Sequence, residues 1–178
     1  MKATGIVRRI DDLGRVVIPK EIRRTMRIRE GDPLEIYTDR EGEVIFKKYS
    51  PIGELAQFAQ QYAETLSKTC GLSVVICDRD AVIACAGVPR RDYADRKLTA
   101  EADRVIENRQ FYTPAEGDEL TVVEGGGPVG CLMPIITEGD IAGCVASVRS
   151  EEKTPVAPEI EAKLIQTAAS FLGKQLES

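Results

Sequence analysis

The residues best suited to chemistry in this sequence are seven basic side chains near its amino-terminal end. They are Arg8, Arg9, Arg15, Lys20, Arg23, Arg24 and Arg27. The last four are spaced i, i+3, i+4 and i+7, so a helix would carry them as one stripe. Clustered guanidinium and ammonium groups neutralise phosphates, which makes double-stranded DNA the expected partner. The helix is short and poor in Asn and Gln, so we expect phosphate contacts and DNA shape to outweigh base reading.

The basic stripe has an alternative interpretation, because a charged helix face is also a common way for a helix to meet water. The distribution of charge along the chain favours a ligand. Residues 1–29 carry nine Lys or Arg against three acidic residues, a net charge of +6, whereas residues 50–178 carry 12 against 20, a net charge of −8. A basic end on an acidic body is typical of a module that binds nucleic acid.

Catalytic chemistry has few candidates in this sequence. The absence of histidine excludes Ser-His-Asp and Cys-His nucleophiles, H-E-x-x-H zinc sites and a histidine general base. Carboxylate or lysine catalysis stays formally possible, but no such pair stands apart from the surrounding charge. We therefore expect no enzyme, no metal and no cofactor. Five cysteines without a C-x-x-C pair are predicted to be mostly buried, reduced thiols: Cys70, Cys77, Cys85, Cys131 and Cys144.

A second candidate site is a small-molecule pocket between a sheet and the irregular segment 89–130. The glycine run at 125–130 matches G-x-G-x-x-G, but a strand is expected after it, so it is interpreted as a loop and not as a dinucleotide site. Such a loop could close over a ligand. The alternative is a plain dimerisation domain whose pocket is filled by its own side chains. The polar groups that could orient a ligand are Arg90, Arg91, Arg96, Arg109 and Tyr112.

Short elements must position the basic residues. The pattern of apolar runs and turn residues predicts strand, strand, helix, strand, strand over residues 5–10, 15–18, 20–28, 34–38 and 43–49. On a strand Arg8 and Arg9 point to opposite faces, so only one of them should contact DNA directly. Two hairpins and a short helix cannot enclose a core. We therefore predict an obligate dimer in which two copies intertwine.

The rest of the chain has the pattern of a larger α+β domain. Ser50 suits a helix N-cap and Pro51 the first helical position, so domains of 1–50 and 51–178 are predicted. Apolar residues at 52, 55, 59, 62 and 66 can face a partner helix, which predicts a second dimer contact and hence a tetramer. Helical character is expected at 52–70, 89–109 and 158–176, and a mostly antiparallel sheet at 72–77, 81–86, 120–123, 131–136 and 141–148.

Two family resemblances sharpen these expectations. Residues 4–19, which include Leu-Gly-Arg-Val-Val-Ile-Pro, and the following Glu-Ile-Arg-Arg at 21–24 resemble the AbrB family of swapped-hairpin transition-state regulators. The resemblance covers about the first 50 residues and implies an interleaved, β-barrel-like dimer that binds DNA through Arg8, Arg15, Arg23 and Arg24. The element order of 51–178, with Asp-Arg-Asp between two apolar strands, resembles a GAF domain. That resemblance implies helix-mediated dimerisation and a ligand pocket, although the N-K-x-F-D signature of cyclic-nucleotide-binding members is missing.

The expected function is a DNA-binding transcription regulator, and the family resemblance implies that it is associated with sporulation and both activates and represses genes. Its expected partners are double-stranded DNA, other copies of itself and an unidentified small molecule, with no membrane. No signal peptide or membrane-spanning stretch is recognised, so we expect a cytoplasmic, nucleoid-associated protein. The alternative is an antitoxin-like DNA-binding protein with a protein partner, although such proteins usually carry a short disordered tail where this chain has a whole domain.

Overall fold

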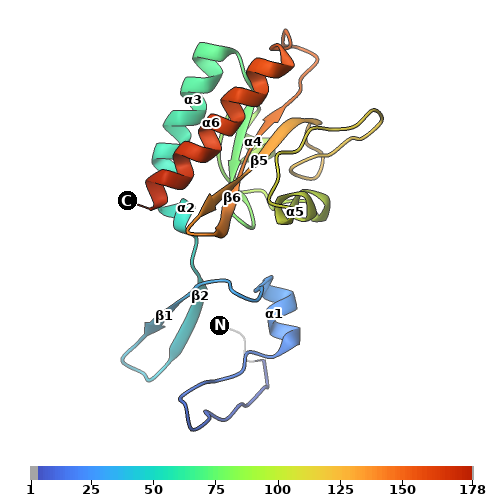
Figure 1. Ribbon diagram of the computed structural model, residues 1–178. Coiled ribbons are helices and arrows are strands. Elements are labelled where there is room, and N and C mark those ends of the chain that lie inside the picture. Colours follow the sequence, from blue (N-terminus) through green and yellow to red (C-terminus); the bar gives the residue numbers. More distant parts are fainter. Residues whose placement is uncertain (1–3, 178) are drawn as a thin grey trace. The chain divides into compact units, whose positions relative to one another are not determined.

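The computed structural model describes residues 4–177 and divides into two compact units, Met1–Tyr49 and Ser50–Ser178 (Figure 1). The amino-terminal unit contains α1 (Lys20–Met26), β1 (Leu34–Thr38) and β2 (Val44–Lys48). The two strands are antiparallel, and Ile36 lies opposite Phe46. The expected helix and the expected second hairpin are therefore confirmed.

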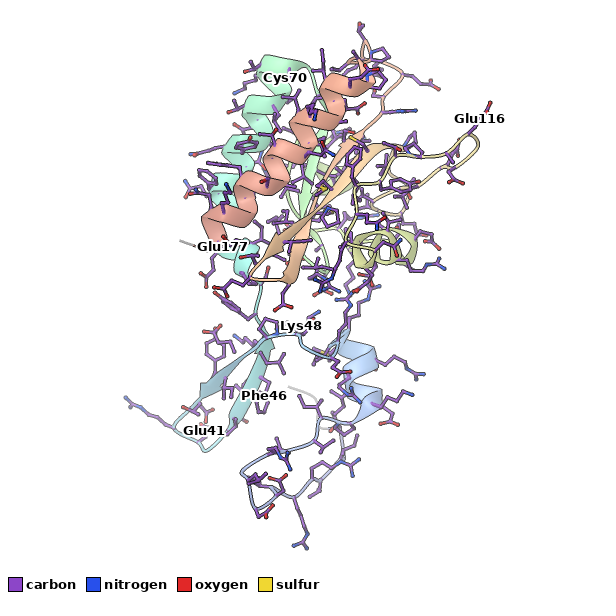
Figure 2. The ribbon with its side chains drawn as sticks, viewed as in Figure 1. Glu41, Phe46, Lys48, Cys70, Glu116 and Glu177 are labelled. Carbon is purple, nitrogen blue, oxygen red and sulfur yellow. The ribbon has the colours of Figure 1, made fainter. Side chains whose placement is uncertain are left out.

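The turn of the β1–β2 hairpin is held by one carboxylate. Oδ1 of Asp39 accepts hydrogen bonds from the backbone N–H of Glu41 at 3.0 Å and of Glu43 at 2.9 Å. A short side-chain acceptor that caps its own loop in this way is the usual reason for Asp in turns. Glu41 lies at the tip of this turn, and Phe46 projects from β2 (Figure 2).

The first expected hairpin forms only its turn. The backbone N–H of Asp11 donates to the carbonyl of Arg15 at 3.0 Å, and that of Gly14 to the carbonyl of Asp11 at 3.0 Å. Gly14 has a φ of 77°, which a glycine adopts without strain. The segments 5–10 and 15–18 are not strands of any sheet among the described residues. An extended segment becomes a strand only when another backbone pairs with it, and a single chain supplies none here.

Helix α1 ends at Met26, one residue before the last member of the predicted basic stripe. Arg27 has left-handed backbone angles, with φ 52° and ψ 41°, and the N–H of Ile28 donates to the carbonyl of Arg23 at 2.8 Å. This is the usual way to close the last turn of a helix. The prediction that the helix extends through Arg27 is therefore wrong, because the left-handed backbone of this C-cap residue ends the helix.

The amino-terminal unit has almost no interior. Among its described residues only Pro19 is buried. Twelve of the 15 large apolar side chains that the structure describes as exposed belong to it, and Val7 is 87% exposed. This is the shortage of core that the sequence predicted for a single copy.

The carboxy-terminal unit is an α+β domain built on one sheet. Its strands run in the order β4-β3-β6-β5, and every neighbouring pair is antiparallel. The expected helix 52–70 is broken at Leu55, and the expected strand 120–123 makes only isolated bridges. Its elements are α2 (Pro51–Glu54), α3 (Ala56–Cys70), β3 (Val74–Cys77), β4 (Val82–Ala86), α4 (Arg90–Tyr93), α5 (Ala100–Glu107), β5 (Val129–Thr137), β6 (Asp140–Val148) and α6 (Pro158–Leu176).

Two cores lie on the two faces of this sheet. Helices α3 and α6 cover one face, and α4, α5 and the connecting segments cover the other (Figure 1). Of the apolar stripe expected to face a partner helix, Ile52, Ala59 and Leu66 are buried in the first core. That expectation is wrong for these three positions, because their own sheet and α6 occupy the stripe.

The thiols behave largely as predicted. Cys77, Cys85, Cys131 and Cys144 are buried, Cys70 is half-buried, and all five are unpaired thiols. Cys77 and Cys144 are direct cross-strand neighbours, and a hydrogen bond between them together with burial raises the pKa of Cys77 well above its ordinary value. In the described part of the chain, no helix is long and apolar enough to cross a bilayer.

Candidate nucleic-acid interface

The seven basic residues singled out from the sequence all lie on the amino-terminal unit, and all are exposed. Three of them stand on α1, where Lys20, Arg23 and Arg24 share one stripe. Arg8 and Arg9 precede the Asp11–Gly14 turn, and Arg15 follows it. The structure thus brings Lys20, Arg23 and Arg24 together on one helix and sets Arg27 apart at its end.

The local sequence explains why a helix of only seven residues forms here. Pro19 is buried and enters the helix with φ −57°, which is already close to the helical value. Glu21 lies in the first turn, while Arg23 and Arg24 lie in the last turn, where cations stabilise the helix dipole. The side that carries Ile22 is half-buried, so the cations are left facing solvent.

Asp11 organises the turn that carries Arg15, a role that composition alone did not reveal. Its Oδ1 accepts the backbone N–H of Leu13 at 3.0 Å and of Arg15 at 2.8 Å, and its Oδ2 accepts Nε of Arg15 at 2.8 Å. The hydrogen bonds from the backbone and side chain of Arg15 lower the pKa of Asp11. One carboxylate therefore fixes both the turn and the direction of Arg15. The arginine side chain is still 70% exposed.

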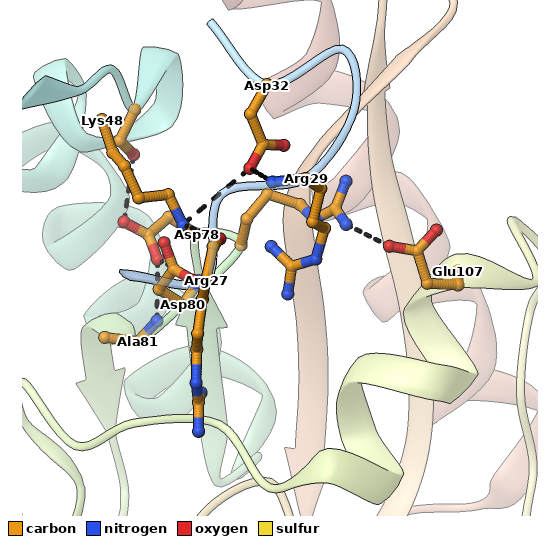
Figure 3. Close-up of polar contacts among 10 residues, drawn as sticks. Arg27, Arg29, Asp32, Lys48, Asp78, Asp80, Ala81 and Glu107 are labelled. Atoms are coloured by element: carbon orange, nitrogen blue, oxygen red, sulfur yellow. Dashed lines mark hydrogen bonds and ion pairs between the residues drawn. The ribbon is translucent and has the colours of Figure 1, made fainter. Parts of the chain in front are cut away.

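A second polar cluster ties the end of α1 to the hairpin (Figure 3). Nζ of Lys48 donates to the carbonyl of Arg27 at 2.8 Å and lies 4.0 Å from a carboxylate oxygen of Asp32. That same oxygen accepts the backbone N–H of Arg29 at 2.8 Å. Lys48 thereby satisfies a carbonyl at the helix end that has no partner inside the helix. The contacts set the orientation of the arginine-bearing helix against β2.

Most of the basic residues on this unit are not neutralised by other groups of the protein that the structure describes. Six of them make no ion pair or side-chain hydrogen bond with any described residue: Arg8, Arg9, Lys20, Arg23, Arg24 and Arg27. In the other unit Arg79 pairs with Glu107 and Arg104 with Glu101, while Arg149 and Lys153 make no ion pair with the described residues. Unpaired cations that repel one another are favourable once an anion neutralises them.

The second predicted site looks different. Arg90 and Arg91 lie on α4, Arg96 follows it, and all three are exposed. Arg109, also exposed, donates to the carbonyl of Gly139, and the half-buried Tyr112 pairs by its backbone with Leu132. Within the described residues, no hydrogen bond or ion pair joins any two of these five side chains. The sheet face beneath them is packed with buried residues such as Val75, Val122 and Leu132. A ligand site formed by these five stays a prediction.

Comparison with known proteins covers both units. A family model described as stage V sporulation protein T C-terminal, transcription factor, matches residues 54–177, and one described as antidote-toxin recognition MazE, bacterial antitoxin, matches residues 7–53. The chain is 50% identical to stage V sporulation protein T of Bacillus subtilis, with 99% of each chain covered. It is 65% identical to the transition state regulatory protein AbrB of the same organism over 29% of this chain and 52% of that protein.

A solved structure supports the fold of the larger unit. The GAF domain/HD domain protein from Geobacter sulfurreducens is 18% identical, with a TM-score of 0.50 and coverage of 69% of this chain and 92% of that one. The GAF-like arrangement expected from the element order is thus confirmed as a fold, and the AbrB resemblance of the first 50 residues is confirmed by sequence identity. With a matching family model over most of its length and a full-length relative at half identity, the chain belongs to the stage V sporulation protein T family of transcription factors.

Proposed function

We propose that this regulator binds double-stranded DNA through its amino-terminal unit and so activates and represses genes of the sporulation programme, on the nucleoid in the cytoplasm. The observation that carries the proposal is the set of exposed, unpaired cations on that unit. The unit has 12 basic against 9 acidic residues in positions 1–49, although the whole chain has a net charge of −5. Charge of the sign that phosphate requires is therefore concentrated on one domain.

The binding unit is an interleaved dimer with swapped hairpins. A single copy leaves Ile6, Val16 and Ile36 at least 41% exposed and the segments 5–10 and 15–18 without strand partners. A second copy supplies both missing items, because its backbone can complete the ladders while its side chains cover the apolar ones. The dimer also doubles the cationic surface, since each copy adds the same arginines.

Contact with DNA is made mainly to phosphates. Helix α1 has seven residues and presents Lys20, Arg23 and Arg24. It contains no Asn or Gln, the residues whose side chains recognise adenine. Arginine matches phosphate geometry with two hydrogen bonds and does not require a particular base. The flanking arginines Arg8 and Arg15 extend the contact beyond the helix, with Arg9 on the opposite side of the chain from Arg8.

The carboxy-terminal unit joins two such dimers into a tetramer. Between α3 and α6, the Phe171 ring centroid lies 5.9 Å from that of Phe58 and 5.7 Å from that of Tyr62. Phe171 is 38% exposed and Ile160, on the same helix, is 55% exposed. Aromatic and aliphatic groups left on paired helices are the usual material of a helix-to-helix contact between subunits.

The direct test is a salt titration of DNA binding by the full chain. If a dimer neutralises about 6 to 10 phosphates, the logarithm of the binding constant should fall against the logarithm of salt concentration with a slope of about −5 to −9. Binding of a DNA duplex is measured by gel shift or fluorescence anisotropy between low and physiological salt. Affinity that is absent, or insensitive to salt, would contradict the proposal.

The role of Asp11 gives a test in which charge and positioning predict opposite signs. Asp11→Ala removes a negative charge, so electrostatics alone predicts tighter binding of DNA. It also removes three hydrogen bonds that hold the turn and Arg15. We expect the second effect to dominate and the DNA dissociation constant to rise about tenfold.

The matched control is Asp12→Ala, which changes the net charge equally. Asp12 is exposed, and its side chain makes no hydrogen bond or ion pair with the described residues. This variant should bind DNA as well as the wild type or slightly better. Tighter binding by both variants would show that Asp11 does not position Arg15.

An antitoxin function is the second candidate, because the MazE antitoxin model matches residues 7–53. The remaining residues match the transcription-factor model, so the place of a toxin-binding tail is taken by a folded domain. Affinity capture with the full chain in its host distinguishes the two functions. Recovery of a stoichiometric toxin protein would favour the antitoxin, and recovery of DNA and the chain alone would favour the regulator.

A further inference from the structure

A cavity of about 430 Å³ opens in the carboxy-terminal unit, where α3 ends, β6 ends and the loop 149–157 leads into α6. Its volume falls within the range of natural small-molecule sites, which is about 300 to 1,000 Å³. Leu72, Val148 and Val156 supply apolar wall. None of the five residues predicted from the sequence lines it. The cavity is therefore a second, independent place for a ligand in this domain.

Four charged side chains line the cavity: Arg149, Lys153, Glu161 and the exposed Glu151. Arg149, Lys153 and Glu161 make no ion pair or side-chain hydrogen bond with any residue that the structure describes. Lys153 and Glu161 are half-buried, so each has given up part of its water shell. Charges in such surroundings are stabilised strongly by a ligand of opposite sign.

The charged ends of Glu161 and Lys153 each lie next to a glycine, where a larger residue would leave them no room. A Cβ atom at Gly130 would lie 2.3 Å from Oε1 of Glu161 and 2.7 Å from Oγ of the buried Ser147. A Cβ atom at Gly87 would lie 2.6 Å from Nζ of Lys153. Side chains at either position would push the carboxylate or the ammonium away. The absence of these two Cβ atoms thus leaves room for the Glu161 carboxylate and the Lys153 ammonium where the structure places them.

The charges of Glu161 and Arg149 both act on the thiol of Cys131. Burial raises the pKa of the Cys131 thiol to about 11; a hydrogen bond with Ser147 opposes the rise, the nearby Glu161 carboxylate adds to it, and Arg149 opposes it. Both side chains therefore act on the same region of β5, from the side of α6 and from the end of β6. The cavity is thus lined by charges of both signs, two cations and two carboxylates, beside the apolar residues Leu72, Val148 and Val156.

We propose that this cavity binds a free α-amino acid with an apolar side chain, whose carboxylate meets Arg149 and Lys153 and whose ammonium meets Glu161. The side chain of the amino acid packs against Leu72, Val148 and Val156. A ligand with only a carboxylate would leave Glu161 without a partner and would be repelled by it. A ligand with only an amine would leave Arg149 and Lys153 without a partner. This goes beyond the proposed DNA binding and does not depend on it, because all these residues lie in the other unit.

The occupant would act on assembly through the elements it joins. It would link the end of α3, the end of β6 and the first turns of α6. Helices α3 and α6 carry the aromatic surface proposed for the contact between dimers. A ligand that fixes the start of α6 relative to α3 therefore favours one arrangement of that surface, provided it binds that arrangement more tightly.

The test is calorimetric titration of the full chain with L-leucine, L-methionine and L-phenylalanine. For leucine, two analogues each lack one charge: 4-methylpentanoate has no ammonium, and 3-methylbutylamine has no carboxylate. We expect at least one of the amino acids to bind, and each analogue to bind at least about tenfold more weakly than leucine. Failure of all three amino acids to bind, or analogues equal to leucine, would overturn the proposal.

Two variants assign the charges to their partners. The Glu161→Gln variant should bind leucine no more tightly than it binds 4-methylpentanoate. The Lys153→Met variant should show a smaller difference in affinity between leucine and 3-methylbutylamine than the wild type shows. Glu159→Gln is the control, because this exposed residue of the same helix turn does not line the cavity. DNA affinity of each variant is measured in parallel, so a failure of ligand binding is distinguished from a failure of the proposed function. Leucine binding that both variants leave unchanged would place the ligand elsewhere.

Discussion

The double variant Arg23→Ala/Arg24→Ala should bind DNA about a thousandfold more weakly than the wild type and lose affinity for all sequences alike. Both side chains are exposed, unpaired and carried on the last turn of α1. A dimer loses four such contacts, and at about 1 kcal/mol each the loss is about 4 kcal/mol. Because the contacts are to phosphate, specific and non-specific duplexes should be affected equally.

The salt dependence gives a second readout of the same change. Four fewer phosphate contacts should make the slope of the logarithm of affinity against that of salt shallower by about 3 to 4. The control is Arg40→Ala/Arg104→Ala, which changes the net charge equally at exposed positions away from the α1 stripe. Arg40 lies in the β1–β2 turn and Arg104 on α5 of the other unit. Full affinity in the Arg23/Arg24 variant, or an equal loss in the control, would contradict the proposed surface.

A fragment of residues 1–50 should be a dimer whose unfolding midpoint rises with protein concentration, while the full chain should have the mass of a tetramer. The fragment has no core in one copy, since Pro19 is its only buried residue among those described. Folding therefore requires a second copy that buries the apolar side chains. Burial of each large side chain stabilises the folded state by about 1.5 to 3 kcal/mol. Folding coupled to association makes stability depend on concentration. Light scattering and thermal unfolding at several concentrations measure both.

A single substitution separates this prediction from simple aggregation. Ile36→Asp places a charge at the middle of β1, on a side chain that is 61% exposed in one copy. If a second copy covers Ile36, the buried carboxylate has no partner and the fragment should be unfolded. Arg40→Asp at the solvent-exposed turn should leave the dimer intact. A folded monomer of residues 1–50, or a folded dimer of the Ile36→Asp fragment, would refute the inference drawn from the missing core.

Several elements were predictable because short-range chemistry decides them. Helix α6 begins at Pro158 and ends at Leu176, as its apolar spacing predicted, and β1 has the predicted bounds. Ser50 accepts the N–H of Gly53 at 3.1 Å, the hydrogen bond expected of a helix N-cap. The exposure of all seven basic residues was equally predictable, because cations are rarely buried without partners.

Other features depended on contacts that no local pattern contains. The spacing of Arg27 fits a helix, yet its backbone is left-handed, because the helix closes at Arg23 and Ile28 and Lys48 of β2 takes the carbonyl of Arg27. The stripe that includes Ile52 and Leu66 is equally suited to a partner helix or to its own sheet. Periodicity shows which face of a helix is apolar and does not show what covers it.

By itself the sequence determined the two-domain organisation of this protein. It has a basic unit that is too small to fold alone and an acidic α+β unit without histidine chemistry. These follow from composition and from spacing along the chain, which tertiary contacts cannot change. Only the tertiary structure decided that Arg149, Lys153 and Glu161 line one cavity, whereas the contact of Asp11 with Arg15 is a local one within a turn. The cavity is lined by segments far apart in the chain, and two glycines outside its lining leave room for the charged ends of Lys153 and Glu161. Such spatial coincidences are set by how the elements pack, so a linear pattern has no means of recording them.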